Sequence, residues 1–91
     1  MIGLNKIMRR NTSIESAQMG NEIGMLHIEL GKYYVLNDIG ADIWNRIEKP
    51  ISMATLIENI IGEYDVEYDQ CKAEVMEFAN ELISKKIAIV E

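Results

Sequence analysis

Two side chains that often perform covalent or metal chemistry, cysteine and histidine, each occur once in the chain, as Cys71 and His27. A cysteine nucleophile needs a neighbouring base, and only His27 could serve. Cys71 falls in the apolar stripe of a predicted helix, where a cysteine is usually an inert small hydrophobic residue. His27 is predicted on the polar, solvent-facing side of a strand. The sequence therefore predicts no enzyme activity and no cofactor.

Acidic residues alternate at Asp65, Glu67 and Asp69, as they do in some calcium-binding loops. No glycine follows at the required place, and no glutamate occupies the twelfth position of such a loop. We interpret these residues as the solvated start of a helix. One histidine and one cysteine also give too few ligands for a transition-metal site, so no metal is expected.

The charge balance argues against a nucleic-acid partner. The chain has nine basic and fifteen acidic residues, a net charge of −6 and a pI near 4.7. Residues 58–81 hold eight acids and only Lys72, whereas Lys6, Arg9 and Arg10 form a basic arm near the start. Nucleic-acid-binding domains concentrate basic residues on one face to neutralise phosphates. We expect a partner of basic or neutral character.

The length of 91 residues predicts a single domain over residues 1–91, with 1–11 as a flexible or strand-like arm. A single cysteine cannot form an internal disulfide, and no signal peptide is apparent. No stretch approaches the roughly 20 apolar residues of a membrane span. We therefore expect a soluble, cytoplasmic protein that does not bind membranes.

Two predicted strands precede the stretch on which the functional argument depends. Gly20 and Asn21 form a turn pair, so residues 12–19 and the segment from Glu22 onward should form a hairpin. Leu26, Ile28 and Leu30 then alternate with polar neighbours. This period of two predicts a strand with these three aliphatic side chains on the core face.

The segment 32–36 is a third strand, entered by a turn at Gly31 and ended by Asn37. In a meander of three strands it lies at the edge, because the chain turns directly into a helix. Tyr34 and Leu36 share one face, expected inward. Lys32 is its only charge, so the edge could pair with an added peptide strand, or it could be covered by the arm or the third helix.

Three helices follow the predicted strands. Asn37 is a predicted N-cap, and Ser52 caps a second helix that begins after Pro50. The third helix runs from about Tyr68 to Lys85, and residues 87–90 form a last strand or a packed tail. Its apolar stripe consists of Cys71, Val75, Phe78 and Leu82. The predicted fold is α+β, a three-stranded antiparallel sheet followed by three α-helices.

The run Tyr34-x-Leu36-Asn37-x-x-Gly40-x-x-Ile43-Trp44 follows Gly31-Lys32-Tyr33 and precedes Phe78-x-x-x-Leu82. This pattern resembles the PqqD-like family, whose small domains recognise the leader part of ribosomally made, post-translationally modified peptides (RiPPs). The resemblance implies a winged-helix-like fold and a stand-alone recognition element of lasso-peptide biosynthesis. One departure is Lys85-Lys86-Ile87, where the family usually has a glycine after the third helix.

The resemblance also implies a site and partners. The leader peptide would pair with the third strand and lie between it and the third helix. The protein would thereby present the leader to the leader peptidase, with the cyclase as a further partner. Asn37, Gly40 and Trp44 would be structural. The implied site consists of the strand residues Lys32, Tyr33, Tyr34, Val35 and Leu36, an apolar helix wall of Cys71, Val75 and Phe78, and Glu74, which would meet a basic or polar leader side chain.

Two alternatives remain from the sequence. A winged-helix DNA-binding regulator would use the basic arm, but Glu74, Glu77 and Glu81 on the third helix would repel phosphates. The protein is expected as a monomer, with a dimer paired through the free strand edge as the other possibility.

Overall fold

The computed structural model describes residues 3–64 and 66–91, and this part of the chain contains six strands and three helices. The expectations for residues 1–2 of the arm and for Asp65 at the helix start lie outside the described residues. In chain order the elements are β1 (Ile7–Arg10), β2 (Ile14–Met19), β3 (Glu22–His27), β4 (Lys32–Leu36), α1 (Asp38–Arg46), β5 (Ile51–Ser52), α2 (Met53–Glu63), α3 (Tyr68–Ser84) and β6 (Ala88–Val90).

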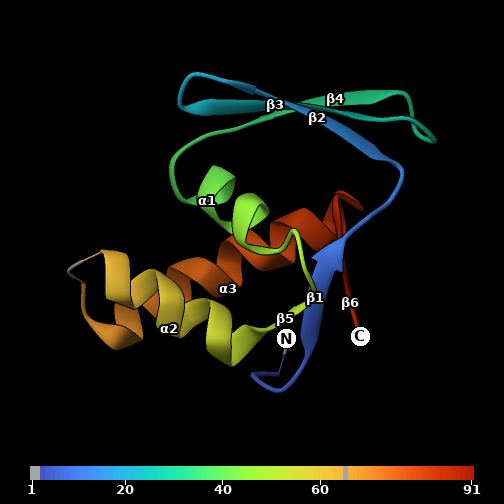
Figure 1. The fold of residues 1–91 in the computed structure, drawn as a ribbon. Helices are drawn as coiled ribbons and strands as arrows, with labels where there is room; N and C mark the ends of the chain where they lie inside the picture. Colours follow the sequence, from blue (N-terminus) through green and yellow to red (C-terminus); the bar gives the residue numbers. More distant parts are fainter. Residues whose placement is uncertain (1–2, 65) are drawn as a thin grey trace.

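The strands form two antiparallel sheets, ordered β2-β3-β4 and β5-β1-β6. The first sheet lies over the helices, and the second lies beside them, at the side where the chain ends (Figure 1). The α+β class and the three-stranded antiparallel sheet are confirmed, but the second sheet, β5-β1-β6, was not predicted. The strands β1, β5 and β6 contain four, two and three residues, which is too few to leave a period-two pattern.

The arm contributes β1, the central strand of the second sheet. Met8 is completely buried, so this segment is part of the core rather than a loose extension. The Arg10 guanidinium lies 4.2 Å from the centroid of the Trp44 ring and donates to the Trp44 carbonyl oxygen at 2.8 and 3.0 Å. Burial lowers the pKa of Arg10. The Arg9 Nε donates to the Glu91 carboxylate at 2.6 Å.

The hairpin between β2 and β3 is confirmed, with Gly20 in the left-handed region at a φ of 64°. Gly31, also at φ 64°, ends the turn into β4. Strand β4 covers residues 32–36 as predicted, and it is an edge of its sheet.

The face assigned to β3 is a wrong prediction. Leu26 is 42% exposed, and Ile28 and Leu30 lie in the turn after β3 and are also exposed. The strand register explains why the inward and outward faces of β3 are exchanged relative to the prediction. Tyr34 pairs with Met25, and residues directly opposite one another share a face, so Met25 is the residue that points inward. Leu26 pairs with Tyr33 on the outer face instead.

His27 is buried with 1% exposure, so its predicted solvent-facing position is wrong as well. Its Nδ1 accepts a hydrogen bond from the Leu30 backbone N–H at 3.2 Å, and its carbonyl oxygen accepts from the Gly31 N–H at 2.8 Å. The residue thus stabilises the turn that leads into β4.

The helices cover the inner face of the β2-β3-β4 sheet and form most of the core. Ile43 and Trp44 of α1 are buried, and the Trp44 Nε1 donates to the Ser16 Oγ on β2 at 3.3 Å. Asn37 occupies the predicted N-cap position, although its side chain makes no capping hydrogen bond. The Ser52 Oγ accepts from the Thr55 N–H at 3.2 Å, which confirms that cap. No helix in the described ranges is both long and apolar enough to cross a bilayer.

At the end of α3, Lys86 takes the place of the glycine that the family usually has after this helix. Lys86 adopts a φ of 60°, the left-handed conformation that glycine usually supplies after a helix. Its N–H donates to the Ile83 carbonyl oxygen at 3.0 Å, and the Ile87 N–H donates to that of Leu82 at 2.8 Å. These two bonds form a Schellman motif. Ile87 is fully buried beside it, so the chain enters β6 without a glycine.

Candidate functional site

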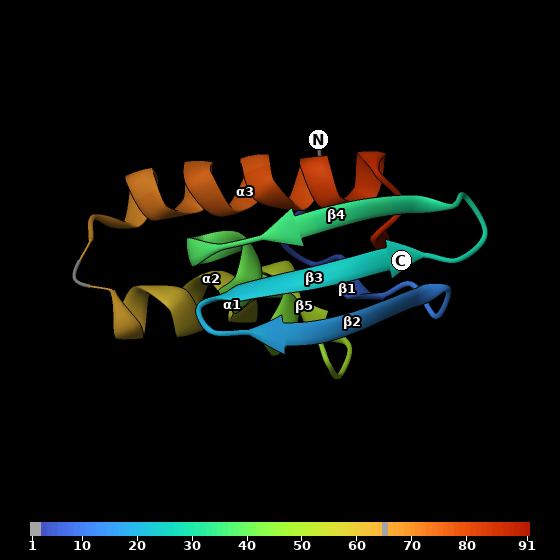
Figure 2. The ribbon, with the colours of Figure 1, turned by 90° about the horizontal axis from the view of Figure 1, so that it is seen from above.

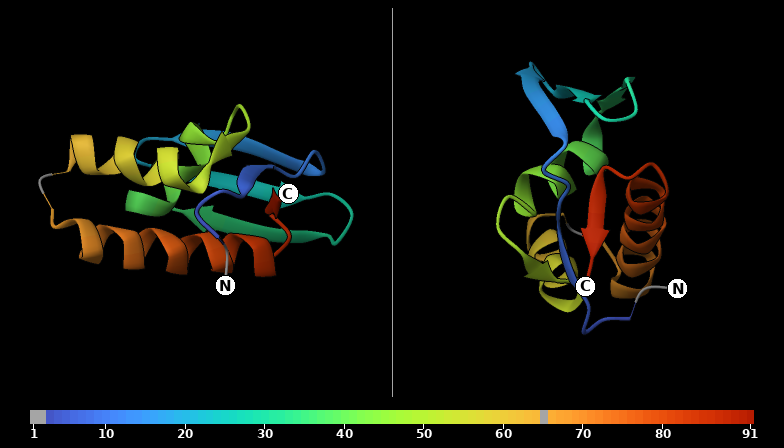
Figure 3. Two further views of the ribbon diagram at one scale, coloured as in Figure 1. Left: turned by 90° about the horizontal axis from the view of Figure 1, so that it is seen from below. Right: turned by 90° about the vertical axis from the view of Figure 1, so that its right-hand side faces the viewer.

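Strand β4 has one unpaired edge. It pairs with β3 on one side, and α3 runs alongside the other (Figures 2 and 3). Alternate residues of an antiparallel strand direct both N–H and C=O to the same edge, so the free side presents a repeating set of donors and acceptors. Lys32 is the only charged residue of the strand. This edge can accept another strand.

A cleft of about 180 Å³ lies between β4 and α3, and we call it the β4–α3 cleft. It is lined by Val35, Leu36, Asn37, Gly40, Phe78, Glu81, Leu82 and Lys85. A Cβ atom built on Gly40 would lie 3.6 Å from the Phe78 ring, so the absence of a side chain at Gly40 leaves space against that ring. Side chains of an added strand would meet an apolar wall here.

Lys85 lies across one end of this cleft. Its ammonium is 5.4 Å from the centroid of the Tyr34 ring and 2.8 Å from the Glu81 carboxylate. The charge therefore sits over the inner face of β4, held by a cation–π contact and an i,i+4 ion pair.

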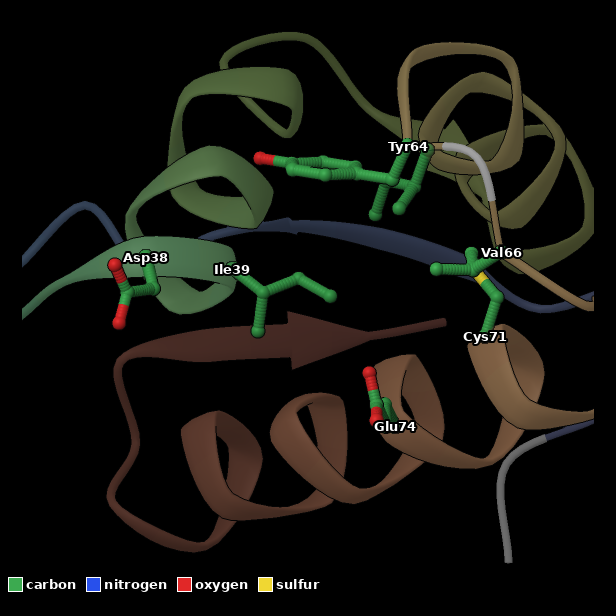
Figure 4. Close-up of a pocket in the computed structure, with 7 residues that line it drawn as sticks. Asp38, Ile39, Tyr64, Val66, Cys71 and Glu74 are labelled. Atoms are coloured by element: carbon green, nitrogen blue, oxygen red, sulfur yellow. The ribbon is translucent and has the colours of Figure 1, made fainter.

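A second pocket, the helix-junction pocket, has a volume of about 360 Å³ and is lined by Asp38, Ile39, Ile60, Tyr64, Val66, Cys71 and Glu74 (Figure 4). It lies where α1 begins, α2 ends and α3 begins. Burial, and secondarily the Glu74 carboxylate, raises the pKa of the Cys71 thiol. A raised pKa disfavours the nucleophilic thiolate, which agrees with a structural role for Cys71.

The sequence-predicted site residues divide into three groups. Val35, Leu36 and Phe78 come together in the β4–α3 cleft. Cys71 and Glu74 lie in the helix-junction pocket instead, and Val75 is fully buried in the core.

The remaining predicted residues belong to β4. Lys32 is exposed at its start, and Tyr33 is 61% exposed on the outer face of the sheet. Tyr34 is partly buried on the inner face, as expected from its alternation with Tyr33.

Sequence reasoning missed several residues of the cleft. Asn37 and Gly40 were expected to be only structural, and Glu81 and Lys85 were not assigned to the site. Residues three and seven positions after Phe78 are neighbours on one flank of a helix, and these are Glu81 and Lys85. That spacing was the available signal. Which flank faces β4 depends on packing.

Neither metal binding nor the DNA-binding alternative gains support from the described ranges. Within them, no group of three or more potential metal ligands occurs. The basic arm is also engaged within the fold, because Arg9 pairs with Glu91 and Arg10 binds the Trp44 carbonyl oxygen. Both guanidinium groups therefore have partners within the fold.

Comparison with known proteins gives one family and two solved structures. The family model described as "Coenzyme PQQ synthesis protein D (PqqD)" matches residues 22–88, which is more than half of the chain. No curated protein sequence matches. The structure titled "TbiB1 in Complex with the TbiA(beta) Leader Peptide" superimposes with a TM-score of 0.82 at 24% identity, over 88% of this chain and 93% of that one.

The second structure, "Lasso peptide synthetase B1 complexed with the leader peptide", superimposes with a TM-score of 0.78. It is 26% identical and covers 90% of this chain and 96% of that chain. Each of the two solved structures contains a bound leader peptide, according to its description.

Proposed function

The chain belongs to the PqqD family, and on that premise we propose that it is a non-catalytic protein that binds the leader region of a ribosomally synthesised precursor peptide. The leader adds as a strand to the free edge of β4 and places side chains in the β4–α3 cleft. The bound leader is then presented to the leader peptidase, and further to the cyclase, of a lasso-peptide pathway. The solved relatives with bound leader peptides support this class of ligand.

The observation that carries the proposal is the unprotected edge of β4 beside an apolar cleft. Proteins usually shield such an edge with charges, prolines or a covering element. Here one lysine protects five residues. Each backbone hydrogen bond to an added strand contributes about 0.5–1.5 kcal/mol, so a short ladder alone gives limited affinity. The side chains that enter the cleft must supply the rest and the selectivity.

The described residues offer no catalytic constellation to compete with this role. Cys71 is buried with a raised thiol pKa, and the Nδ1 of His27 is occupied by the Leu30 N–H. Chemistry on the precursor therefore falls to partner enzymes. The DNA-binding alternative gains no support, because Arg9 and Arg10 are held within the fold.

The test is an NMR titration of the ¹⁵N-labelled protein with the leader of the precursor encoded beside it. We expect the largest amide shifts in residues 32–36 and at Phe78. Strand β2, the opposite edge of the same sheet, is an internal control because its backbone is also unpaired on one side. A scrambled leader is the peptide control.

An N-methyl scan of the leader then distinguishes strand pairing from other modes. Methylation removes one backbone donor at a time, and every second position should lose about two- to tenfold in affinity, with smaller losses between. Absence of shifts in β4, or losses without a period of two, would refute strand addition at this edge.

A further inference from the structure

The helix-junction pocket is not used by strand pairing, yet it is twice as large as the β4–α3 cleft, at about 360 against 180 Å³. Its walls are mainly apolar, formed by Ile39, Ile60, Val66 and Cys71. Small-ligand pockets measure roughly 300–1,000 Å³, so this pocket suits one long side chain rather than a folded segment.

The pocket lies on the line that an added strand would follow. Lys85, near the end of α3, lies over Tyr34, whereas Glu74, near its start, shares the pocket with Asp38 just beyond β4. The helix and β4 are therefore antiparallel, as Figure 2 shows. At about 3.3 Å per residue, a strand that continues past Leu36 reaches the pocket within about two residues.

Two acidic residues, Asp38 and Glu74, line this apolar space. In Figure 4 the Glu74 carboxylate points toward it, whereas the Asp38 carboxylate points away from the other labelled side chains. In the part of the chain that the structure describes, neither forms an ion pair. The two carboxylates therefore give this pocket negative charge that no cation of the described residues offsets at ion-pair distance. The N-terminus of α1 offsets this by only about half a positive charge.

The opposite end of the site has the reverse character. Lys32 begins β4, and Lys85 lies above Tyr34. Lys85 is paired with Glu81, so among the described residues Lys32 is the uncompensated charge at this end, whereas the other end carries the unpaired Asp38 and Glu74; charged side chains on the peptide would favour one register along β4.

We propose that the helix-junction pocket receives a lysine or arginine side chain of the peptide paired with β4. The apolar stem contacts Ile39 and Ile60, and the cationic head pairs with the Glu74 carboxylate, with Asp38 as a second, outlying negative charge. This inference rests on the proposed function and adds a specificity pocket to it.

A basic side chain suits this pocket better than the alternatives. Lysine and arginine combine an apolar stem with a charged head, as the walls and rim require. A purely aliphatic side chain would fill the space but would remove water from two carboxylates without pairing them. An acidic side chain would be repelled by both.

The test measures leader affinity by fluorescence anisotropy for the wild type and for Glu74→Gln, Asp38→Asn and Glu77→Gln. The probe is the labelled leader encoded beside the protein, at low and moderate salt. Glu74→Gln should weaken binding about five- to tenfold at low salt and reduce the salt dependence. Asp38→Asn should weaken it about threefold, and asparagine tolerates the φ of 49° at this position.

Glu77→Gln is the matched control. It removes the same charge from the same helix, but Glu77 lies beside Lys72 and Met76 on the other flank of α3. The leader affinity of the Glu77→Gln variant should stay within twofold of that of the wild type. Circular dichroism melts verify that each variant folds.

Each basic residue of the leader is also replaced by norleucine, which keeps the stem and removes the charge. One replacement should weaken binding as much as Glu74→Gln, and combining the two should add almost nothing. Equal losses for Glu74→Gln and Glu77→Gln, full additivity, or tight binding of a leader without basic residues would overturn the pocket assignment. Failure of the wild-type protein to bind the leader of any precursor encoded beside it would instead overturn the proposed function.

Discussion

The two edges of the β2-β3-β4 sheet expose the same kind of backbone groups but differ in what surrounds them. Strand β2 carries Glu15, Ser16 and Gln18, and the hollow beside its turn is lined largely by polar side chains. Strand β4 carries one lysine and borders a cleft that contains Phe78 and Leu82.

The difference indicates which part of the site provides selectivity. An unpaired backbone edge accepts almost any extended chain, so hydrogen bonds alone would not favour β4 over β2. The apolar flank of α3 is present beside β4. If this comparison is correct, changes to that flank should affect peptide binding more than changes to the exposed strand itself.

The largest effect is expected for Phe78→Ala, which removes the main apolar wall of the cleft. Leader affinity should fall more than tenfold. Unfolding by urea should show a loss of about 1–3 kcal/mol, because Phe78 is only partly buried. Met76→Ala on the other flank is the control, with a similar stability cost and nearly unchanged affinity. Equal affinity losses in the two variants would mean that the cleft is not the contact surface.

A smaller effect is expected from a charge placed on each edge in turn. Val35 and Ala17 both lie opposite Gly24, on the same exposed cross-strand row. Val35→Lys should weaken leader binding about three- to tenfold, whereas Ala17→Lys should change it less than twofold, by anisotropy titration. The reverse order would place the peptide on β2.

The smallest effect concerns the reactivity of Cys71. Because burial and Glu74 raise its pKa, the thiolate fraction at pH 8 is lower than for a free thiol of pKa about 8.5. Alkylation by iodoacetamide should be slower at pH 8 than for a free thiol, and its rate should keep rising at pH values where that of a free thiol has levelled off. Glu74→Gln should shift this profile to lower pH, since it removes a charge that opposes ionisation.

Bound leader should slow alkylation of Cys71 further, by about twofold or more, because the peptide covers the helix-junction pocket on the β4 side. A peptide on the β2 edge would leave the alkylation rate unchanged. Mass spectrometry of the modified protein over time measures both effects.

Local sequence signals predicted β4 and the three helices well. The boundaries of β4 and α3 follow from the turn at Gly31, the break at Asn37 and the apolar stripe that begins at Cys71. The same stripe supplies Phe78 and Leu82 to the cleft but not Cys71 or Val75. Its centre faces the core, which is why Val75 is fully buried, and the cleft is formed by the adjacent flank. A helical pattern identifies the buried side but not the neighbour of each flank.

The inversion of β3 has a different cause. Ile23, Met25 and His27 alternate just as regularly as Leu26, Ile28 and Leu30, so the pattern allows either face. Pairing with β4 and packing on α1 decide between them. The second sheet could not be predicted because its pairings join residues 7–10 to residues 51–52 and 88–90, and such short segments carry no signal of their own.

The pairing of β1 with β6 also determines how this domain can be connected to other polypeptides. The Ile7 N–H donates to the Glu91 carbonyl oxygen at 3.1 Å, and the Glu91 N–H donates to that of Ile7 at 2.8 Å. Glu91 lies across the helices from the β2-β3-β4 sheet (Figure 1). A group attached at Glu91 would therefore lie away from the β2-β3-β4 sheet and would leave the edge of β4 uncovered.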